Sequence, residues 1–68
     1  MQPGSRLTYE HPSTRLFFVW GGGPYIDVYP SRRAPHPVRH LRASHVDQTQ
    51  AALEARADEH VWDLAEAV

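Results

Sequence analysis

Hydrophobic and polar residues alternate in the first half of this chain and change to a helical spacing in the second. Residues 6–11, 15–20 and 25–29 are rich in β-branched and aromatic side chains and end at turn-forming residues, as short strands do. From Val46 onward there is no glycine or proline, and residues recur at steps of three and four along one stripe. The stripe comprises Val46, Gln50, Leu53, Ala57, Val61, Leu64 and Val68. This pattern predicts an α+β fold, with a small three-stranded antiparallel sheet (a β-hairpin plus one edge strand) packed on one long C-terminal helix over residues 45–68.

The segments between these elements contain the residues that interrupt them. Residues 21–24 are three glycines and a proline, which predict the hairpin turn. Residues 30–43 hold three prolines and four arginines and predict a stiff connector, with a short helical turn at residues 37–43. Ser44 followed by Asp47 resembles a capping box that starts the helix. The chain is expected to form a single domain over residues 1–68.

The short length of the chain limits how much surface it can bury on its own. It has 68 residues and no cysteine, so neither a disulfide nor thiolate-bound zinc can stabilise it. Association with a partner is then the remaining common source of buried surface. The longest uncharged run, residues 16–26, has 11 residues and is too short for a membrane span. No secretory signal is visible, so a cytoplasmic location is expected, and arginine without lysine suggests a GC-rich coding sequence.

Few residues suggest catalysis or a cofactor. The glycine run precedes a strand and does not open a helix, unlike a phosphate-binding loop. The histidines are His11, His36, His40, His45 and His60; they lack a recognisable set of metal ligands and are interpreted as polar surface residues, with metal binding or pH sensing left open. Asp27 is interpreted as paired with an arginine of a neighbouring strand or as solvated. We therefore expect no enzyme activity and no cofactor.

The predicted hairpin has one aliphatic and one aromatic face. A four-residue loop at 21–24 pairs Trp20 with Tyr25 and Phe17 with Val28. The helix would then cover the face that contains Val19 and Ile26. The opposite face would present an interaction surface formed by Leu16, Phe18, Trp20, Tyr25, Asp27 and Tyr29, because tyrosine and tryptophan are enriched at protein interfaces. The alternative is that the N-terminal tail or a different strand register hides these aromatic side chains.

The back of the predicted helix suggests self-association. Trp62 lies far around the helix from the apolar stripe, and the small residues Ala51 and Ala55 lie beside it. A large indole next to small side chains would let two helices approach closely, which predicts a homodimer. The alternative is that Trp62 packs against the chain's own N-terminal tail.

Charge is divided between the two halves of the chain. Residues 1–46 carry six arginines and two acidic residues, whereas residues 47–68 carry one arginine and six acidic residues. The basic connector offers Arg32, Arg33, Arg39 and Arg42 as nucleic-acid contacts. The net charge of −1 and the acidic helix argue against a dedicated nucleic-acid-binding protein. The leading prediction is therefore a non-enzymatic accessory or regulatory protein that binds another protein or itself, and the alternative is a nucleic-acid-binding domain.

Overall fold

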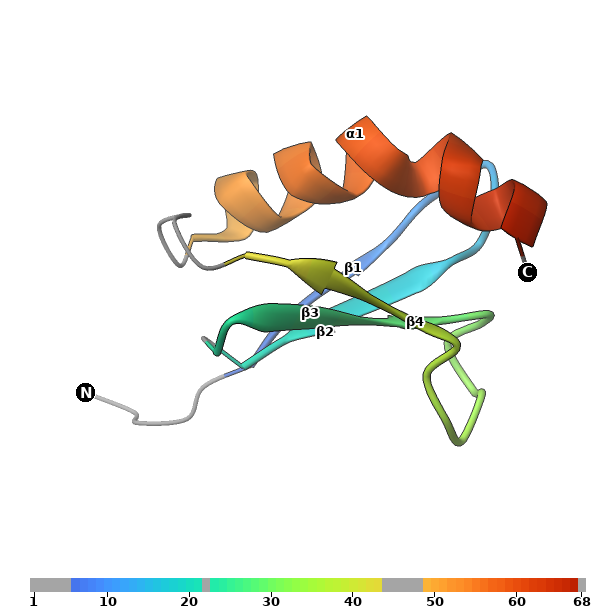
Figure 1. Cartoon of the computed structure of the whole chain (residues 1–68), viewed down its shortest axis with the longest axis horizontal. Coiled ribbons are helices and arrows are strands. Elements are labelled where there is room, and N and C mark those ends of the chain that lie inside the picture. The colour runs from blue at the N-terminus through green and yellow to red at the C-terminus, as the bar shows by residue number, and fades with distance from the viewer. Residues whose placement is uncertain (1–5, 22, 44–48, 68) are drawn as a thin grey trace.

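The strands form one antiparallel sheet in which neighbours along the chain are also neighbours in space. The sheet contains β1 (Leu7–Glu10), β2 (Phe17–Trp20), β3 (Tyr25–Tyr29) and β4 (Arg39–Arg42), and one helix follows, α1 (Gln50–Ala67). This computed structural model describes residues 6–21, 23–43 and 49–67. α1 lies across one face of the sheet (Figure 1), and among the described residues no helix or strand covers the other face. The α+β class is confirmed, with an antiparallel sheet and one C-terminal helix.

The prediction of three strands was wrong, because the predicted connector contains a fourth. β4 pairs with β3 and places Leu41 opposite Ile26. Backbone hydrogen bonds extend the pairing at both ends, from Val38 N to Val28 O (2.7 Å) and from Ala43 N to Pro24 O (2.8 Å). Leu41 is the only apolar residue of β4, so the sequence pattern of the strand is weak. The short helical turn predicted at residues 37–43 is therefore a strand.

The predicted register between β2 and β3 was wrong by one residue. Phe18 lies opposite Val28, and Val19 lies opposite Asp27. Because side chains alternate along a strand, a shift of one residue exchanges the faces of one strand relative to its neighbour. The observed register places Phe18 and Trp20 on the same side as Ile26 and Val28, which buries two large aromatic side chains where the predicted register would have buried Phe17 and Val19.

The connection between β1 and β2 is a tight turn. His11 N donates to Leu16 O at 3.0 Å, and Arg15 N donates to His11 O at 2.9 Å. Arg15 has a φ of 66°. This is the left-handed region, which costs a residue with a Cβ atom about 1–2 kcal/mol and is usually occupied by glycine or asparagine. The turn therefore contains an arginine in a backbone conformation that another residue would adopt more easily.

α1 begins later than predicted. Thr49 lies just before the helix and caps it, since its Oγ1 accepts from Ala52 N at 3.1 Å and its carbonyl accepts from Leu53 N at 3.0 Å. The capping box predicted from Ser44 and Asp47 lies outside the described residues. The predicted stripe is confirmed over its central part, where Leu53, Ala57, Val61 and Leu64 are buried, whereas Gln50 is exposed.

The core lies between α1 and one face of the sheet. Trp20 completes it at the β2–β3 connection, where its indole N–H donates to Gly23 O at 2.9 Å. This hydrogen bond satisfies the polar atom of an otherwise apolar buried side chain. The buried apolar residues are Leu16, Phe18, Trp20, Ile26, Val28, Leu41, Ala43, Leu53, Ala57, Val61 and Leu64.

Candidate functional site

The face of the sheet opposite α1, which we call the open face, contains apolar and basic side chains together. The register and the alternation along each strand define its members. They are Thr8, Glu10, Phe17, Val19, Tyr25, Asp27, Tyr29, His40 and Arg42. All are exposed or half-buried. This face therefore leaves aromatic and aliphatic groups accessible to a partner.

A shallow hollow lies on the open face and has a volume of about 280 Å³; we call it the apolar depression. Phe17, Val19 and Tyr29 contribute to it from β2 and β3, and the rings of Phe17 and Tyr29 are 6.4 Å apart between centroids. The complete lining is Arg6, Thr8, Phe17, Val19, Tyr29, Arg32, Ala34 and Pro35. The β3–β4 connection supplies Arg32, Ala34 and Pro35, and it projects from the sheet on the side away from α1 (Figure 1).

A second depression, which we call the arginine depression, adjoins the first. Its volume is about 380 Å³, and it is lined by Glu10, Arg15, Ser31, Arg32 and Arg33. Arg32 lines both depressions. The one acidic group, Glu10, lies 3.7 Å from Arg15, so three arginines face a single carboxylate. The excess of guanidinium groups favours binding of an anion.

Asp27 and His40 form a cross-strand pair at the β4 side of the open face. His40 Nε2 lies 3.2 Å from Asp27 Oδ1, and the ring of Tyr25 lies edge-on to that of His40 with 6.4 Å between centroids. Asp27 thus pairs with a histidine and not with an arginine, whereas its partial exposure agrees with the alternative that it is solvated. The Asp27 and His40 side chains are 43% and 54% exposed, and they line neither of the two depressions.

Side chains from α1 reach the outer backbone of both edge strands. Gln50 Nε2 donates to the carbonyl of Thr8 in β1 at 2.8 Å, and Arg56 Nε donates to the carbonyl of Arg42 in β4 at 3.0 Å. Unpaired edge groups are the positions at which an additional strand would pair. The two hydrogen bonds occupy one backbone acceptor on each edge strand.

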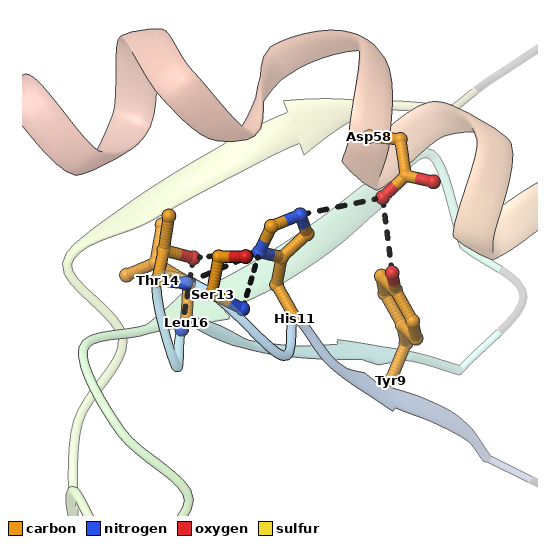
Figure 2. Close-up of polar contacts among 6 residues, drawn as sticks. All are labelled: Tyr9, His11, Ser13, Thr14, Leu16 and Asp58. Carbon is orange, nitrogen blue, oxygen red and sulfur yellow. Dashed lines mark hydrogen bonds and ion pairs between the residues drawn. The ribbon is translucent and has the colours of Figure 1, made fainter.

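A separate polar cluster joins β1, the β1–β2 turn and α1 (Figure 2). His11 is 9% exposed, and its Nδ1 accepts from the backbone N–H groups of Ser13 and Thr14, both at 3.2 Å. Asp58 of α1 lies on the other side of the imidazole, with Oδ1 3.8 Å from His11 Nε2. His11 was interpreted as a polar surface residue, and that interpretation was wrong because its ring closes the turn.

Tyr9 of β1 also belongs to this cluster. Its hydroxyl donates to Asp58 Oδ1 at 3.0 Å (Figure 2). Desolvation by burial, the hydrogen bond to Asp58 and the negative charges of Asp58 and Glu54 together raise the pKa of the Tyr9 hydroxyl above its ordinary value of 10.0. The tyrosine therefore remains a neutral donor over a wider pH range than a free tyrosine.

The predicted interaction residues fall into three groups in the structure: buried residues, tyrosines on the open face, and residues on the solvent side of α1. The predicted exposure of Leu16, Phe18 and Trp20 was wrong, since all three are at most 2% exposed beneath α1. Tyr25 and Tyr29 do lie on the open face, with Tyr25 52% exposed.

The residues predicted on the back of the helix lie on its solvent side. Trp62 is 60% exposed, and Ala51 and Ala55 are also exposed. Trp62 packs edge-on against His11, with 5.5 Å between ring centroids. An open hollow of about 440 Å³ on the same helix is lined by Ala52, Ala55, Arg56 and Glu59.

The four arginines predicted as nucleic-acid contacts are divided between two places. Arg32 and Arg33 line the arginine depression. Arg39 and Arg42 lie in β4 at the sheet edge and line neither depression. The structure thus brings only half of this set together.

Sequence reasoning missed several residues that line the two depressions. They are Arg6, Thr8, Glu10, Arg15, Phe17, Val19, Ser31, Ala34 and Pro35. Phe17 and Val19 were assigned to the covered face because of the register error. The signal that could have corrected it is size: within β2, Phe18 and Trp20 have more apolar surface to bury than Phe17 and Val19 do.

In the part of the chain that the structure describes, no three histidine, aspartate or glutamate side chains gather closely enough to hold a metal ion. His45 lies outside the described residues. Within the described ranges, no helix is both long and apolar enough to span a bilayer.

The comparisons with known proteins give the chain no family. No protein-family model, no curated protein and no solved structure matches it.

Proposed function

We propose that this chain is a non-enzymatic protein-interaction module that binds a partner protein through the open face of its sheet. One observation carries the proposal: α1 covers one face, whereas the other has an apolar depression formed by Phe17, Val19 and Tyr29 with Arg6 and Arg32 also in its lining. Accessible aromatic and aliphatic groups with arginine beside them have the composition of a protein interface. The proposal includes the cytoplasmic location expected from the sequence, which cell fractionation tests.

Binding suits the open face better than catalysis does. Its carboxylate–imidazole pair is Asp27 with His40. Both side chains are about half exposed, and they line neither depression. General acid–base catalysis needs such a pair held against a bound substrate. The absence of enzyme activity is thus part of the proposal.

Affinity capture from the chain's own host, followed by mass spectrometry, tests this function. Val19→Lys places a charge in the apolar depression, and Val38→Lys is the matched control because Val38 is 44% exposed and lines neither depression. We expect a protein that the wild type and Val38→Lys capture, that Val19→Lys loses, and that survives nuclease treatment. Equal capture by all three proteins would contradict the proposal.

Nucleic-acid binding is the second candidate, and the distribution of charge favours it. The arginine depression is basic, whereas the acidic residues of α1 lie on the other side of the sheet. Nucleic-acid binding depends steeply on salt because bound counterions are released. Val19→Lys would strengthen such binding by adding a positive charge, so the same variant separates the two candidates.

Self-association through α1 is a further part of the proposed function. Trp62 is 60% exposed, and the hollow beside Ala52 and Ala55 offers a place for the indole of a second copy. We propose an antiparallel homodimer in which the tryptophan of each chain packs against the alanines of the other. Sedimentation equilibrium at micromolar concentration tests it: we expect a dimer that Trp62→Ala converts to a monomer. A wild type that remains monomeric would contradict the dimer.

A further inference from the structure

The two depressions on the open side of the sheet are neighbours, because Arg32 lines both. One is apolar, with Phe17, Val19 and Tyr29 in its lining, and the other is lined mainly by arginine. A ligand that fills both must therefore carry an apolar group close to an anionic group.

The conformation of Arg15 supports a ligand role for the arginine depression. Arg15 has a φ of 66°, where glycine or asparagine would cause less strain. Its ion pair with Glu10, at 3.7 Å, contributes little stability to offset this strain, because the Arg15 side chain is 73% exposed. Strained residues are retained where the surrounding structure uses them, often at binding sites. An arginine in this position adds positive charge to the depression at a cost in stability.

Charge identifies the complementary ligand. Four arginines line the two depressions together, Arg6, Arg15, Arg32 and Arg33, against the single carboxylate of Glu10. We propose that the site binds an acidic segment of a partner protein, with an aliphatic or aromatic side chain in the apolar depression and a carboxylate or phosphate in the arginine depression. This inference rests on the proposed function and names the chemistry of its partner.

A protein segment fits the site better than a single-stranded nucleic acid does. Bases bind by stacking on exposed ring faces. Phe17 and Tyr29 are half-buried and inclined at 59° to each other, so they present no flat platform. The chain also has a net charge of −1, which gives a polyanion little long-range attraction.

Selection from a random-dodecapeptide display library tests the ligand chemistry without assuming a sequence. We expect the peptides enriched on the wild type to combine an aliphatic or aromatic residue with two or more nearby acidic residues. The affinity of the best peptide is then measured by fluorescence anisotropy, and we expect a Kd on the order of 10–100 μM for so small a contact. Replacing its acidic residues by glutamine should weaken binding, and replacing one by phosphoserine shows which anion the site prefers.

Variants locate the peptide on the surface. We expect Arg33→Gln to weaken binding roughly 2- to 5-fold, and Arg32→Gln to weaken it more because Arg32 lines both depressions. Arg39→Gln is the matched control, since it removes the same charge outside both depressions. Arg15→Gly is the most specific variant: it should raise the melting temperature and yet weaken peptide binding roughly 2- to 5-fold.

Three results would overturn the inference. They are enriched peptides without acidic residues, equal weakening by Arg39→Gln and Arg32→Gln, and an oligothymidylate that displaces the peptide and binds more tightly when Val19 is replaced by lysine. Loss of the captured host protein in Val19→Lys, together with peptides that lack acidic residues, would reject the ligand chemistry while leaving the proposed function in place.

Discussion

The two faces of the sheet contain similar apolar residues, but α1 covers those of one face only (Figure 1). Phe17 and Phe18 are adjacent and identical, yet Phe18 is fully buried beneath α1 and Phe17 is half-buried on the open face. The covered face pairs large side chains from β2 with Ile26 and Val28 of β3. The open face places its apolar residues beside arginines instead. The comparison shows that apolar surface serves packing where a helix covers it and is available for recognition where none does.

Truncating the two phenylalanines gives the largest expected difference. Phe18→Ala should lower the free energy of unfolding by about 3–5 kcal/mol, because it leaves a cavity in the core. Phe17→Ala should lower it by about 1 kcal/mol, because Phe17 keeps part of its surface in water in the folded state. Urea denaturation measures both values.

Phe17→Leu and Phe18→Leu form a milder pair for the same comparison, in case Phe18→Ala does not fold. Equal losses in the two leucine variants would contradict the register of β2 against β3. A larger loss in the Phe17 variant would restore the register expected from a four-residue loop.

This register is the point at which sequence reasoning failed, and the reason is physical. Both faces of β2 and β3 are largely apolar, so alternation alone does not identify the covered side. The indole hydrogen bond from Trp20 to Gly23, which holds the β2–β3 loop, is a contact that no periodicity predicts. By contrast, α1 has a polar side and an apolar side, and the buried positions Leu53, Ala57, Val61 and Leu64 follow from the sequence alone.

The candidate site was harder to predict than the helix because it combines distant segments. Arg6 precedes β1, Arg15 lies in a turn, and Arg32 follows β3. Only the folded sheet brings them together, so spacing along the chain contains no signal for this set. Arg32 and Arg33 could be selected as basic, but their apolar neighbours depended on the register and the topology.

Two histidines on opposite faces give the next comparison. His11 and His40 each lie beside a carboxylate. The His11 ring is buried and accepts hydrogen bonds from two backbone N–H groups, whereas His40 is 54% exposed. His11→Ala should cost about 1–3 kcal/mol of unfolding free energy, since it removes a buried ring and leaves two part-buried backbone donors without their acceptor. His40→Ala should cost about 0–1 kcal/mol, as an exposed pair does. Thermal unfolding followed by circular dichroism measures both.

His11→Asn is the control for the His11 variant. The asparagine side-chain oxygen can accept from the backbone N–H groups of the same turn, so this variant should recover most of the lost stability. If His11→Asn and His11→Ala were equally destabilised, the turn contacts of Nδ1 would not be the cause.

The smallest expected effect is a pH dependence on the covered side. Tyr9 faces α1 and donates to Asp58, and burial, this hydrogen bond and the nearby carboxylates raise the pKa of its hydroxyl. Because the folded state binds this proton more tightly, the contribution to stability is complete below pH about 10, the ordinary tyrosine pKa. It declines as the pH rises through the higher pKa of the folded state.

Ultraviolet titration of phenolate absorbance should show one tyrosine that ionises above the ordinary range. Tyr9→Phe should remove that component, and Asp58→Asn should move it to lower pH, because the variant keeps an acceptor but loses the charge. A high-pH component that persists in Tyr9→Phe would belong to another tyrosine. It would contradict the burial of Tyr9 and its hydrogen bond to Asp58 as the causes of the raised pKa.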